Sequence, residues 1–339
     1  MYQSIDPAAK NAVNAGSGKS EVRAMNERRS GRREFLKTAL GAGAGVSLAC
    51  MAGVPAFARK AAESIAIKPV TDSIALVTGA GCNVVTLTGG EGVLMVDGGL
   101  ADRSGDLFNA ITKHTGAARP SVLFNTHWHW DHTGANERAG KAGVKIIAHE
   151  NTKLWLGADF IVQWEQREYK PRPRVAWPTE TFYTDGKLAF GGQRVEYGYL
   201  PRAHTDGDIY VRFPDQNVLV VGDLLSVEGY PILDVDTGGW LGGAVDATQA
   251  LIDLADDETV VVPGKGRLAT KADLVAQHQM LSTMRERLVG LMRKGQGTDD
   301  LLAAPPTAEF DEKWGDPKLF LVNAYRGLWG HVRELGGIV

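Results

Sequence analysis

Residues 121–132 read Ser-Val-Leu-Phe-Asn-Thr-His-Trp-His-Trp-Asp-His, and this stretch decides the predicted fold. Its first part, Ser121–Phe124, is a short apolar run that predicts a buried strand. Four side chains that can bind a metal follow within six residues of one another: His127, His129, Asp131 and His132. Strand ends position side chains better than free loops do, and imidazole and carboxylate groups suit zinc. A lone histidine is more often a core or surface residue, but this grouping indicates a metal site.

Runs of β-branched residues elsewhere in the chain predict further strands. Three of them, separated by Gly-rich turns, predict an antiparallel meander at Ser73–Val77, Asn83–Thr88 and Val93–Asp97. Later strands are expected at Val144–Ile147, Thr181–Phe182, Lys187–Phe190, Val195–Leu200, Asp208–Phe213, Val218–Val221 and Thr259–Val262. Helices are expected at Leu107–His114, Asn151–Leu156, Ala247–Ala255, Lys271–Lys294 and Leu319–Leu335. Two β-rich halves, each followed by helices, predict two sheets packed between helical layers.

Residues 155–178 interrupt this alternation of strands and helices. They combine five large aromatic residues with several Lys and Arg residues and three prolines. Connections of this length in a compact domain usually have a functional role or are mobile. Two interpretations stay open: the aromatic side chains, with Trp128, Trp130, Tyr230 and Trp240, form the wall of a pocket for an apolar substrate, or they pack as ordinary core residues.

The histidine stretch resembles that of the metallo-β-lactamase superfamily of hydrolases, and the likeness extends over about residues 65–275. Residues 93–99, Val-Leu-Met-Val-Asp-Gly-Gly, are similar to an early strand and aspartate of that family. The resemblance implies a mixed α/β (α+β) fold, a four-layer αββα sandwich with one or two metal ions between its sheets. In such a fold Asp97 is expected to be a structural carboxylate near the metal loop and not a ligand.

The resemblance also implies a set of metal ligands. His204, within Ala-His-Thr-Asp-Gly-Asp, matches the third histidine of the family's first metal site. Asp223, within Val-Gly-Asp-Leu, matches the carboxylate that bridges two metals in the glyoxalase II-like and lactonase-like branches. The first zinc ion is therefore expected on His127, His129 and His204. A second ion would be held by Asp131 and His132, with Asp223 between the two metals.

One position departs from the family's pattern. The family closes its site with a Pro-Gly-His-Gly turn, whereas residues 263–266 of this chain read Pro-Gly-Lys-Gly. A protonated lysine is a poor ligand, although ligation by a neutral Lys265 is not excluded because burial or a metal can depress a lysine pKa. Three interpretations remain: Lys265 replaces the second metal with its own charge, it stabilises a developing oxyanion, or it marks a protein that has lost activity. One zinc ion is expected, and the second is uncertain.

The expected chemistry is hydrolysis by a zinc-bound hydroxide, formed because zinc lowers the pKa of bound water from about 16 to about 7. The hydroxide would attack the carbonyl of an ester, thioester, lactone or amide. Asp131 would orient the water or accept its proton, and the metal and Lys265 would stabilise the oxyanion. Cys82 is expected to be structural.

Particular residues help to distinguish between the other functions that occur within this fold. A diiron oxygen-reducing member usually has Glu in place of the second histidine, so His129 argues against it, and the acidic charge of the chain argues against a nuclease. A periplasmic β-lactamase is an alternative, although Asp223 fits the glyoxalase-like branches better. A non-catalytic metal- or ligand-binding protein on the same scaffold is the remaining alternative.

The first 58 residues are expected to be a twin-arginine (Tat) signal peptide. Arg32 and Arg33 precede an apolar run rich in small residues at 38–54, and Ala56-Phe57-Ala58 forms an A-x-A cleavage pattern. The run is too short and too rich in Gly and Ala to span a bilayer. Met25 would give a more usual signal length as the start. The expected location is the periplasm or the exterior, after a transient interaction with the Tat machinery.

Residues 59–339 are expected to form a single metallo-β-lactamase-like domain with C-terminal helices. The chain has a net charge of −3, and its first 58 residues hold more basic than acidic side chains, so the body is more acidic still. An acidic body argues against a nucleic-acid partner, which needs a basic surface. Cleavage would leave Cys82 as the only cysteine, so no intramolecular disulfide is expected. The expected partner is a small-molecule substrate.

Overall fold

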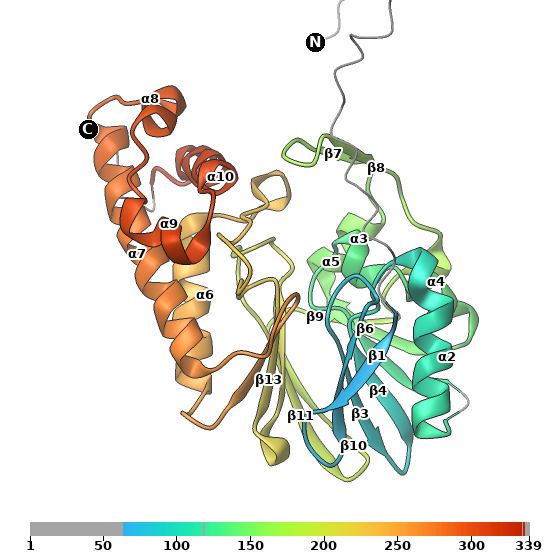
Figure 1. The fold of residues 1–339 in the computed structure, drawn as a ribbon. Coiled ribbons are helices and arrows are strands. Elements are labelled where there is room, and N and C mark those ends of the chain that lie inside the picture. Colours follow the sequence, from blue (N-terminus) through green and yellow to red (C-terminus); the bar gives the residue numbers. More distant parts are fainter. Residues whose placement is uncertain (1–63, 118, 334, 336–339) are drawn as a thin grey trace, which may run out of the picture. The chain divides into compact units, whose positions relative to one another are not determined.

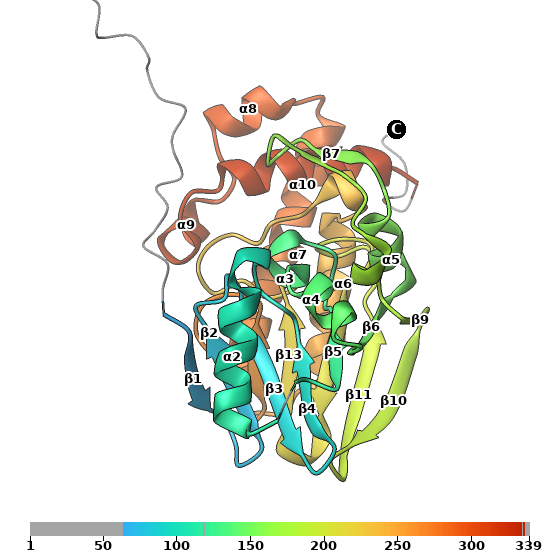
Figure 2. The same ribbon diagram turned by 90° about the vertical axis from the view of Figure 1, so that its right-hand side faces the viewer.

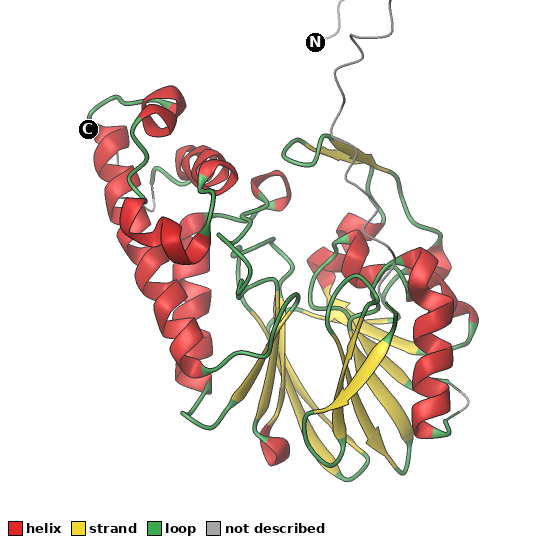
Figure 3. Ribbon diagram, in the orientation of Figure 1, coloured by secondary structure: helices red, strands yellow, loops and turns green. Residues whose placement is uncertain are grey.

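A computed structural model of the chain describes residues 64–117, 119–333 and 335. The expected signal peptide lies outside these residues. Within them, strands form two facing sheets, and helices cover the outer face of each sheet (Figures 1 and 3). This arrangement is the predicted four-layer αββα sandwich. None of the described helices combines the length and the apolar character needed to cross a membrane.

The first sheet has seven strands in the order β1-β2-β3-β4-β5-β6-β9. The first four strands pair antiparallel, which confirms the predicted meander. Strands β4, β5, β6 and β9 pair in parallel. The bounds are β1 Ala66–Pro69, β2 Ile74–Thr78, β3 Val84–Gly89, β4 Gly92–Val96, β5 Val122–Phe124, β6 Lys145–His149 and β9 Glu180–Phe182. Because β4, β5 and β6 run parallel, the loops after them leave the same edge of the sheet.

The second sheet has five strands in the order β10-β11-β12-β13-β14. Its strands pair antiparallel except for β13 and β14, which run in parallel. The bounds are β10 Asp185–Phe190, β11 Gln193–Tyr199, β12 Ile209–Phe213, β13 Val218–Gly222 and β14 Val260–Pro263. Strand β13 is buried along its whole length, as expected for a central strand covered on both faces.

Helices on the two outer faces complete the layers. Helices α2 (Ser104–Thr115) and α4 (Asn136–Lys141) lie against the first sheet, and α6 (Leu241–Leu254) and α7 (Lys271–Arg293) lie against the second (Figures 1 and 2). The remaining helices are α3 (Trp130–Thr133), α5 (Glu150–Leu156), α8 (Thr298–Ala303), α9 (Ala308–Trp314) and α10 (Lys318–Gly330). Single turns of 3-10 helix occur at Ala101–Arg103, Arg174–Ala176, Pro214–Gln216 and Val235–Thr237.

Three apolar cores fill the spaces between the four layers. Between the sheets lie residues such as Phe124, Ile147 and Phe213. A second core joins the first sheet to α2 and includes Leu107 and Ile111. A third joins the second sheet to α6, α7 and α10. Burial of these side chains is the main stabilising contribution, at about 25 cal/mol per Å² of apolar surface.

The structure differs from the predicted elements at several places, and strand β1 and the short helices α3 and α4 were not predicted. Helix α6 begins at Leu241, six residues before the predicted Ala247. Glycines 242 and 243 hid its start, and Gly243 is required there because a Cβ atom would lie 2.0 Å from the Arg202 carbonyl oxygen. Helices α8 and α9 were not expected. Part of the interruption at 155–178 is a small hairpin of β7 (Phe160–Val162) and β8 (Arg167–Tyr169).

Candidate metal centre

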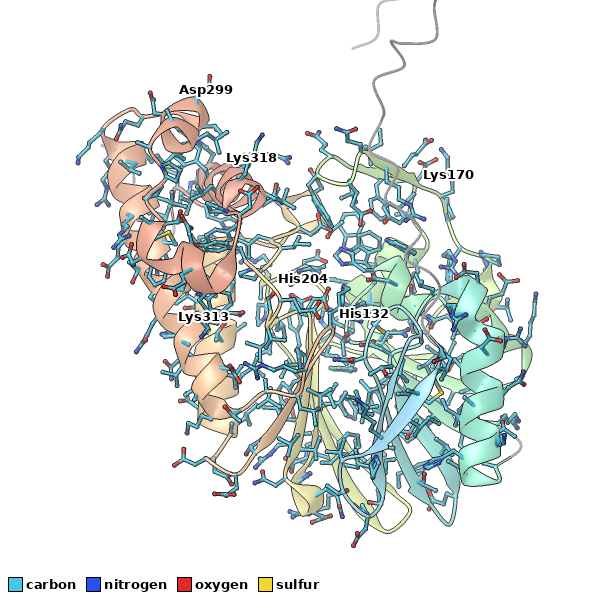
Figure 4. All side chains as sticks on the ribbon, viewed as in Figure 1. His132, Lys170, His204, Asp299, Lys313 and Lys318 are labelled. Carbon is cyan, nitrogen blue, oxygen red and sulfur yellow. The ribbon has the colours of Figure 1, made fainter. Side chains whose placement is uncertain are left out.

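Loops from both sheets bring the predicted site residues together at one end of the sandwich. The segment that carries His127, His129, Asp131 and His132 follows β5 of the first sheet. His204, Asp223 and Lys265 follow β11, β13 and β14 of the second sheet. Figure 4 shows His132 and His204 near each other at the same end of the two sheets. The site therefore depends on the packing of one sheet against the other.

Hydrogen bonds determine which nitrogen of His204 and of His129 carries its proton. Nδ1 of His204 donates to the carbonyl oxygen of Ile232 at 2.8 Å, because that oxygen can only accept. Nε2 of His129 donates in the same way to Asp234 Oδ2 at 3.0 Å. The free lone pairs are then on His204 Nε2 and His129 Nδ1, which lie only 3.1 Å apart. Two neutral imidazoles in these tautomers have no hydrogen to share at that contact.

His127 is oriented by a similar chain of donors. The Thr126 hydroxyl donates to Asp97 Oδ2 at 2.8 Å, so it accepts from His127 Nδ1 at 3.1 Å. The lone pair of His127 is therefore on Nε2. That atom is buried and has no hydrogen-bond partner among the described residues.

These three histidines fit a metal ion. His127, His129, His204 and Asp223 each offer a ligand atom, and the four atoms lie within 4.8 Å of one another. A buried polar atom without a partner costs free energy, and two facing lone pairs repel. A cation between the three imidazoles would remove both penalties. In metal sites the second nitrogen of a ligating His usually donates to a carboxylate or carbonyl, as His129 and His204 do here.

Asp97 and His132 lie next to the three histidines and are hydrogen-bonded to each other. Asp97 follows β4 with a left-handed backbone (φ 65°), which is uncommon for a residue with a side chain. It accepts hydrogen bonds from the Thr126 amide at 2.8 Å and from His132 Nδ1 at 2.8 Å. Asp97 is thus placed as the structural carboxylate that the sequence predicts. His132 Nε2 lies 3.2 Å from Asp223 Oδ1.

Lys265 lies between the two carboxylates that were expected to serve a second metal. Its Nζ is 2.7 Å from Asp223 Oδ2 and 2.9 Å from Asp131 Oδ2. The turn that carries it is fastened to the first sheet, because the Asn83 side chain donates to the Pro263 and Gly266 carbonyls. Asp131 does not join the group of His127, His129, His204 and Asp223; its carboxylate binds Lys265.

The charges of this cluster shift its pKa values in consistent directions. Burial alone would lower the pKa of Lys265, but Asp223 and Asp131 raise it above its usual value. Burial alone would raise the pKa of Asp223, but Lys265 and His132 hold it well below its usual range. Lys265 is therefore an ammonium group that pairs with ionised carboxylates. This protonation state argues against the interpretation in which a neutral Lys265 is a ligand.

Burial and neighbouring imidazoles act in the opposite direction on the ligand histidines. Burial, followed by the fields of His132 and His129, lowers the pKa of His127 well below its usual value. Burial and His129 lower the pKa of His204 to about 4. Both imidazoles are therefore neutral at pH 7, which is the form that binds a metal.

A small cavity opens beside this cluster, with a volume of about 160 Å³. His204, Asp223 and Lys265 form one wall of the cavity. The opposite wall comes from the loop after β13 and includes Leu225, Glu228 and Tyr230. A substrate group in this cavity would meet the ligand histidine and the ammonium group together.

The aromatic residues of 155–178 mostly pack against one another. The Trp128 ring is 2% exposed and meets Phe160 and Tyr169 edge to face. Trp130 is 36% exposed, and the Arg167 guanidinium lies 4.4 Å from its ring centroid. None of the five aromatic residues of this segment lines the cavity of about 160 Å³. Tyr230, from outside the segment, does.

Sequence reasoning missed Asp234, Thr126 and the Ile232 carbonyl, which orient the three histidines. Asp234 is buried and also accepts a hydrogen bond from Thr237 Oγ1. The only signal in the sequence is the series Asp234-Val-Asp236 in a short polar loop, which is common in turns. The pairing of Asp234 with His129 joins residues 105 positions apart, so only the fold reveals it.

Comparison with known proteins agrees with the fold. The family profile of the metallo-beta-lactamase superfamily matches residues 77–265, more than half of the chain. The chain therefore belongs to the metallo-β-lactamase superfamily and is a hydrolase of that class. Its relatives include the acyl-coenzyme A thioesterase MBLAC2 of Homo sapiens, 25% identical over an alignment of 210 residues; the match covers 55% of this chain and 74% of the relative. The Bos taurus protein of the same name is 24% identical over equal shares.

Solved structures of low sequence identity share the fold. A metallo-beta-lactamase from Pontibacter korlensis has a TM-score of 0.53 and 22% identity, over 64% of this chain and 99% of that one. A double mutant of the sec-alkyl sulfatase PisA1 has a TM-score of 0.65 and 17% identity. That match covers 80% of this chain but only 55% of the sulfatase.

Proposed function

We propose that this chain is a single-zinc hydrolase that cleaves an acyl ester or thioester. The observation that carries the proposal is the position of Lys265, whose ammonium group lies between Asp131 and Asp223. The three imidazoles beside it offer unprotonated nitrogens to one ion. We therefore infer that the three histidines bind one divalent cation and that the ammonium group of the lysine pairs with the two carboxylates.

His127, His129 and His204 would hold the zinc ion, with Asp223 near it. Zinc at this site supplies a Lewis acid, which activates water near neutral pH and polarises a carbonyl oxygen. The chain's own groups do the remaining work. Asp131 accepts the proton of the attacking water, and the Lys265 ammonium, which borders the cavity, stabilises the negative charge that develops on the substrate oxygen.

The acyl class is supported by the relatives at 24% and 25% identity, which are named acyl-coenzyme A thioesterases. The match covers 74% of those proteins and 55% of this chain. We extend to this chain only the class of bond, a carbonyl ester or thioester. Lactones and amides share the carbonyl chemistry and are the next candidates.

Metal analysis and turnover test the proposal together. Protein purified without chelator should contain about one zinc ion per chain and hydrolyse an aryl ester or an acyl thioester. His127→Ala should lose both the metal and the activity, because it removes the unpartnered nitrogen. His278→Gln is the matched control, since His278 bonds the Val245 carbonyl on α6 and lies outside the site. It should keep both properties.

Three outcomes would contradict the proposal. A chain without bound metal would indicate a non-catalytic protein on the same scaffold. Two zinc ions per wild-type chain would contradict the role given to Lys265. Turnover of β-lactams without turnover of esters or thioesters would assign the chain to the β-lactamases instead.

We further propose that the protein acts in the periplasm or outside the cell after Tat export. The support is the Arg32-Arg33 pair, the apolar run after it and the Ala56-Phe57-Ala58 pattern. Replacing both arginines by lysine should leave the precursor in the cytoplasm, as measured by cell fractionation. Unchanged export of this variant would exclude the Tat route.

A further inference from the structure

The tip of the β7–β8 hairpin reaches the candidate metal centre through Trp164. Trp164 lies in the turn between the two strands, and its indole Nε1 donates to Asp234 Oδ1 at 3.1 Å. Its ring centroid is 6.1 Å from that of His129. The hairpin is therefore in contact with the site, although its own residues provide none of the expected ligands.

Asp234 connects the hairpin to His129. One oxygen, Oδ1, accepts from Trp164, and the other, Oδ2, accepts from His129 Nε2 and from Thr237 Oγ1. The side chain is fully buried, so water cannot replace a lost donor without opening the loop. The orientation of this carboxylate determines both the direction of the His129 ring and which of its nitrogens is free.

A second hydrogen bond fastens the same turn. The backbone amide of Gln163 donates to Asp236 Oδ2 at 2.7 Å. Arg326 of α10 forms an ion pair with the other oxygen, Asp236 Oδ1, also at 2.7 Å. Asp234 and Asp236 thus hold the tip of the hairpin by two contacts two residues apart. Elsewhere in the hairpin Phe160 and Tyr169 pack edge to face on Trp128 and Val162 is buried, whereas Ile161 is 62% exposed. The turn itself is held by the contacts of Gln163 and Trp164 with the two aspartates.

We propose that Trp164 is a positioning residue of the metal centre: through the shared Asp234 carboxylate, docking of the hairpin holds His129 in its metal-binding orientation. The inference rests on the proposed zinc site. It assigns Trp164 a role beyond covering the site. The hydrogen bond aligns Asp234, Asp234 aligns His129, and His129 presents Nδ1 to the ion.

Thermodynamic linkage makes the coupling reciprocal. If hairpin docking tightens metal binding by some factor, metal binding must favour the docked hairpin by the same factor. Couplings of this kind are typically about fivefold or larger. Two independent measurements, one at the metal and one at the hairpin, should therefore agree.

The first experiment uses Trp164→Phe, which keeps an aromatic ring but removes the indole donor. The zinc-loaded variant should release zinc to a chelator about fivefold or more faster than the wild type. Its cobalt-substituted form should show a shifted visible absorption band, because the His129 ligand is reoriented. Trp177→Phe is the matched control: it also loses an indole hydrogen bond within residues 155–178, to the Arg172 carbonyl, but has no contact with Asp234. It should behave as wild type in both measurements.

The second experiment needs no variant. Amide hydrogen exchange in residues 160–169 of the full chain should slow when zinc is added, because zinc binding favours the docked hairpin. A purely structural role for Trp164 would speed hairpin exchange in Trp164→Phe and leave the cobalt spectrum and the zinc release rate unchanged. That result would overturn the inference while the proposed function stands. A wild-type chain that binds no zinc would instead remove the proposed function, and this inference with it.

Discussion

Lys265 shows how one side chain can alter the charge of a whole site. Its ammonium group satisfies two carboxylates that would otherwise face each other across a partly buried site. A histidine at the same position would bring a neutral nitrogen and leave those carboxylates to a second cation. In the proposed site, the difference between lysine and histidine would therefore be a difference in the number of metal ions.

The substitution Lys265→His tests this directly. It removes the ammonium group and supplies an imidazole, so the zinc content should rise from about one to about two ions per chain. Elemental analysis after dialysis against zinc gives the count. Lys187→His is the control for adventitious binding by a new surface histidine, since Lys187 is exposed on β10 and pairs with Glu196. An unchanged count in Lys265→His would exclude the idea that Lys265 replaces a metal.

The buried His204 predicts a pH dependence of stability in the metal-free protein. Its pKa is about 4 in the folded chain and about 6.5 when unfolded. Between these values the unfolded chain binds the proton and the folded chain does not, so stability falls as the pH decreases from about 6.5 to about 4. The loss for this group is on the order of 3 kcal/mol.

The effect is measured by urea unfolding of the wild type and of His204→Gln in EDTA, each at pH 7.5 and at pH 4.5. The wild type should lose more stability than His204→Gln over this range, because glutamine does not titrate. Equal losses in the two proteins would show that His204 does not contribute to the pH dependence.

At the scale of elements, the C-terminal helices support the wall of the cavity. Tyr230 lines the cavity, and its ring stacks on that of Phe320 of α10 with 5.1 Å between the ring centroids. Its hydroxyl donates a hydrogen bond to Asp311 Oδ1 of α9 at 2.8 Å. Its backbone amide donates to the Trp314 carbonyl. Helices α9 and α10 follow the part that matches the family profile, so in this chain a C-terminal segment supports a residue of the cavity wall.

Phe320→Ala should therefore change both stability and substrate binding. Phe320 is 2% exposed, and the loss of such a ring costs about 3–5 kcal/mol. The stacking partner of Tyr230 is lost as well, so KM for the substrate should rise while the zinc content stays the same. Leu319→Ala is the neighbouring control. Leu319 is 40% exposed, and its replacement should change stability by less than about 0.5 kcal/mol. Similar losses in the two variants would contradict the packing described here.

At the scale of the whole molecule, the metal centre connects the two sheets. His127 and His129 follow β5 of the first sheet, and His204 follows β11 of the second. An ion held by all three would bind the folded chain and not the unfolded one, where His204 is far from the other two histidines. Such a ligand stabilises the fold by mass action.

Removal of zinc should therefore lower the melting temperature. At a zinc concentration 100 times the dissociation constant, binding contributes about 2.7 kcal/mol, which corresponds to about 5–10 °C for a domain of this size. Calorimetry with and without EDTA measures the shift. His127→Ala should melt at the same temperature in both conditions. A zinc effect of equal size in that variant would place the stabilising ion elsewhere.

Much of the architecture was predictable because it depends on local patterns. The β-branched runs between Gly-rich turns predicted a meander of three strands, and the antiparallel pairing of β2, β3 and β4 confirms it. Helix α7 was predicted to within one residue. The start of α6 was predicted wrongly because Gly243 is required by a tertiary contact with the Arg202 carbonyl and not by helix propensity. The α8 and α9 helices are too short to show a clear period.

The sequence by itself determined the class of fold and the candidate ligands, because His127 to His132 lie in one short segment after one strand. The tertiary structure decided what surrounds them. It alone brings Lys265 to Asp131 and Asp223, joins Asp234 to His129, and connects Trp164 to that pair. Local spacing specifies residues that are neighbours along the chain. Contacts across two sheets depend on how the layers pack, and no local pattern encodes them.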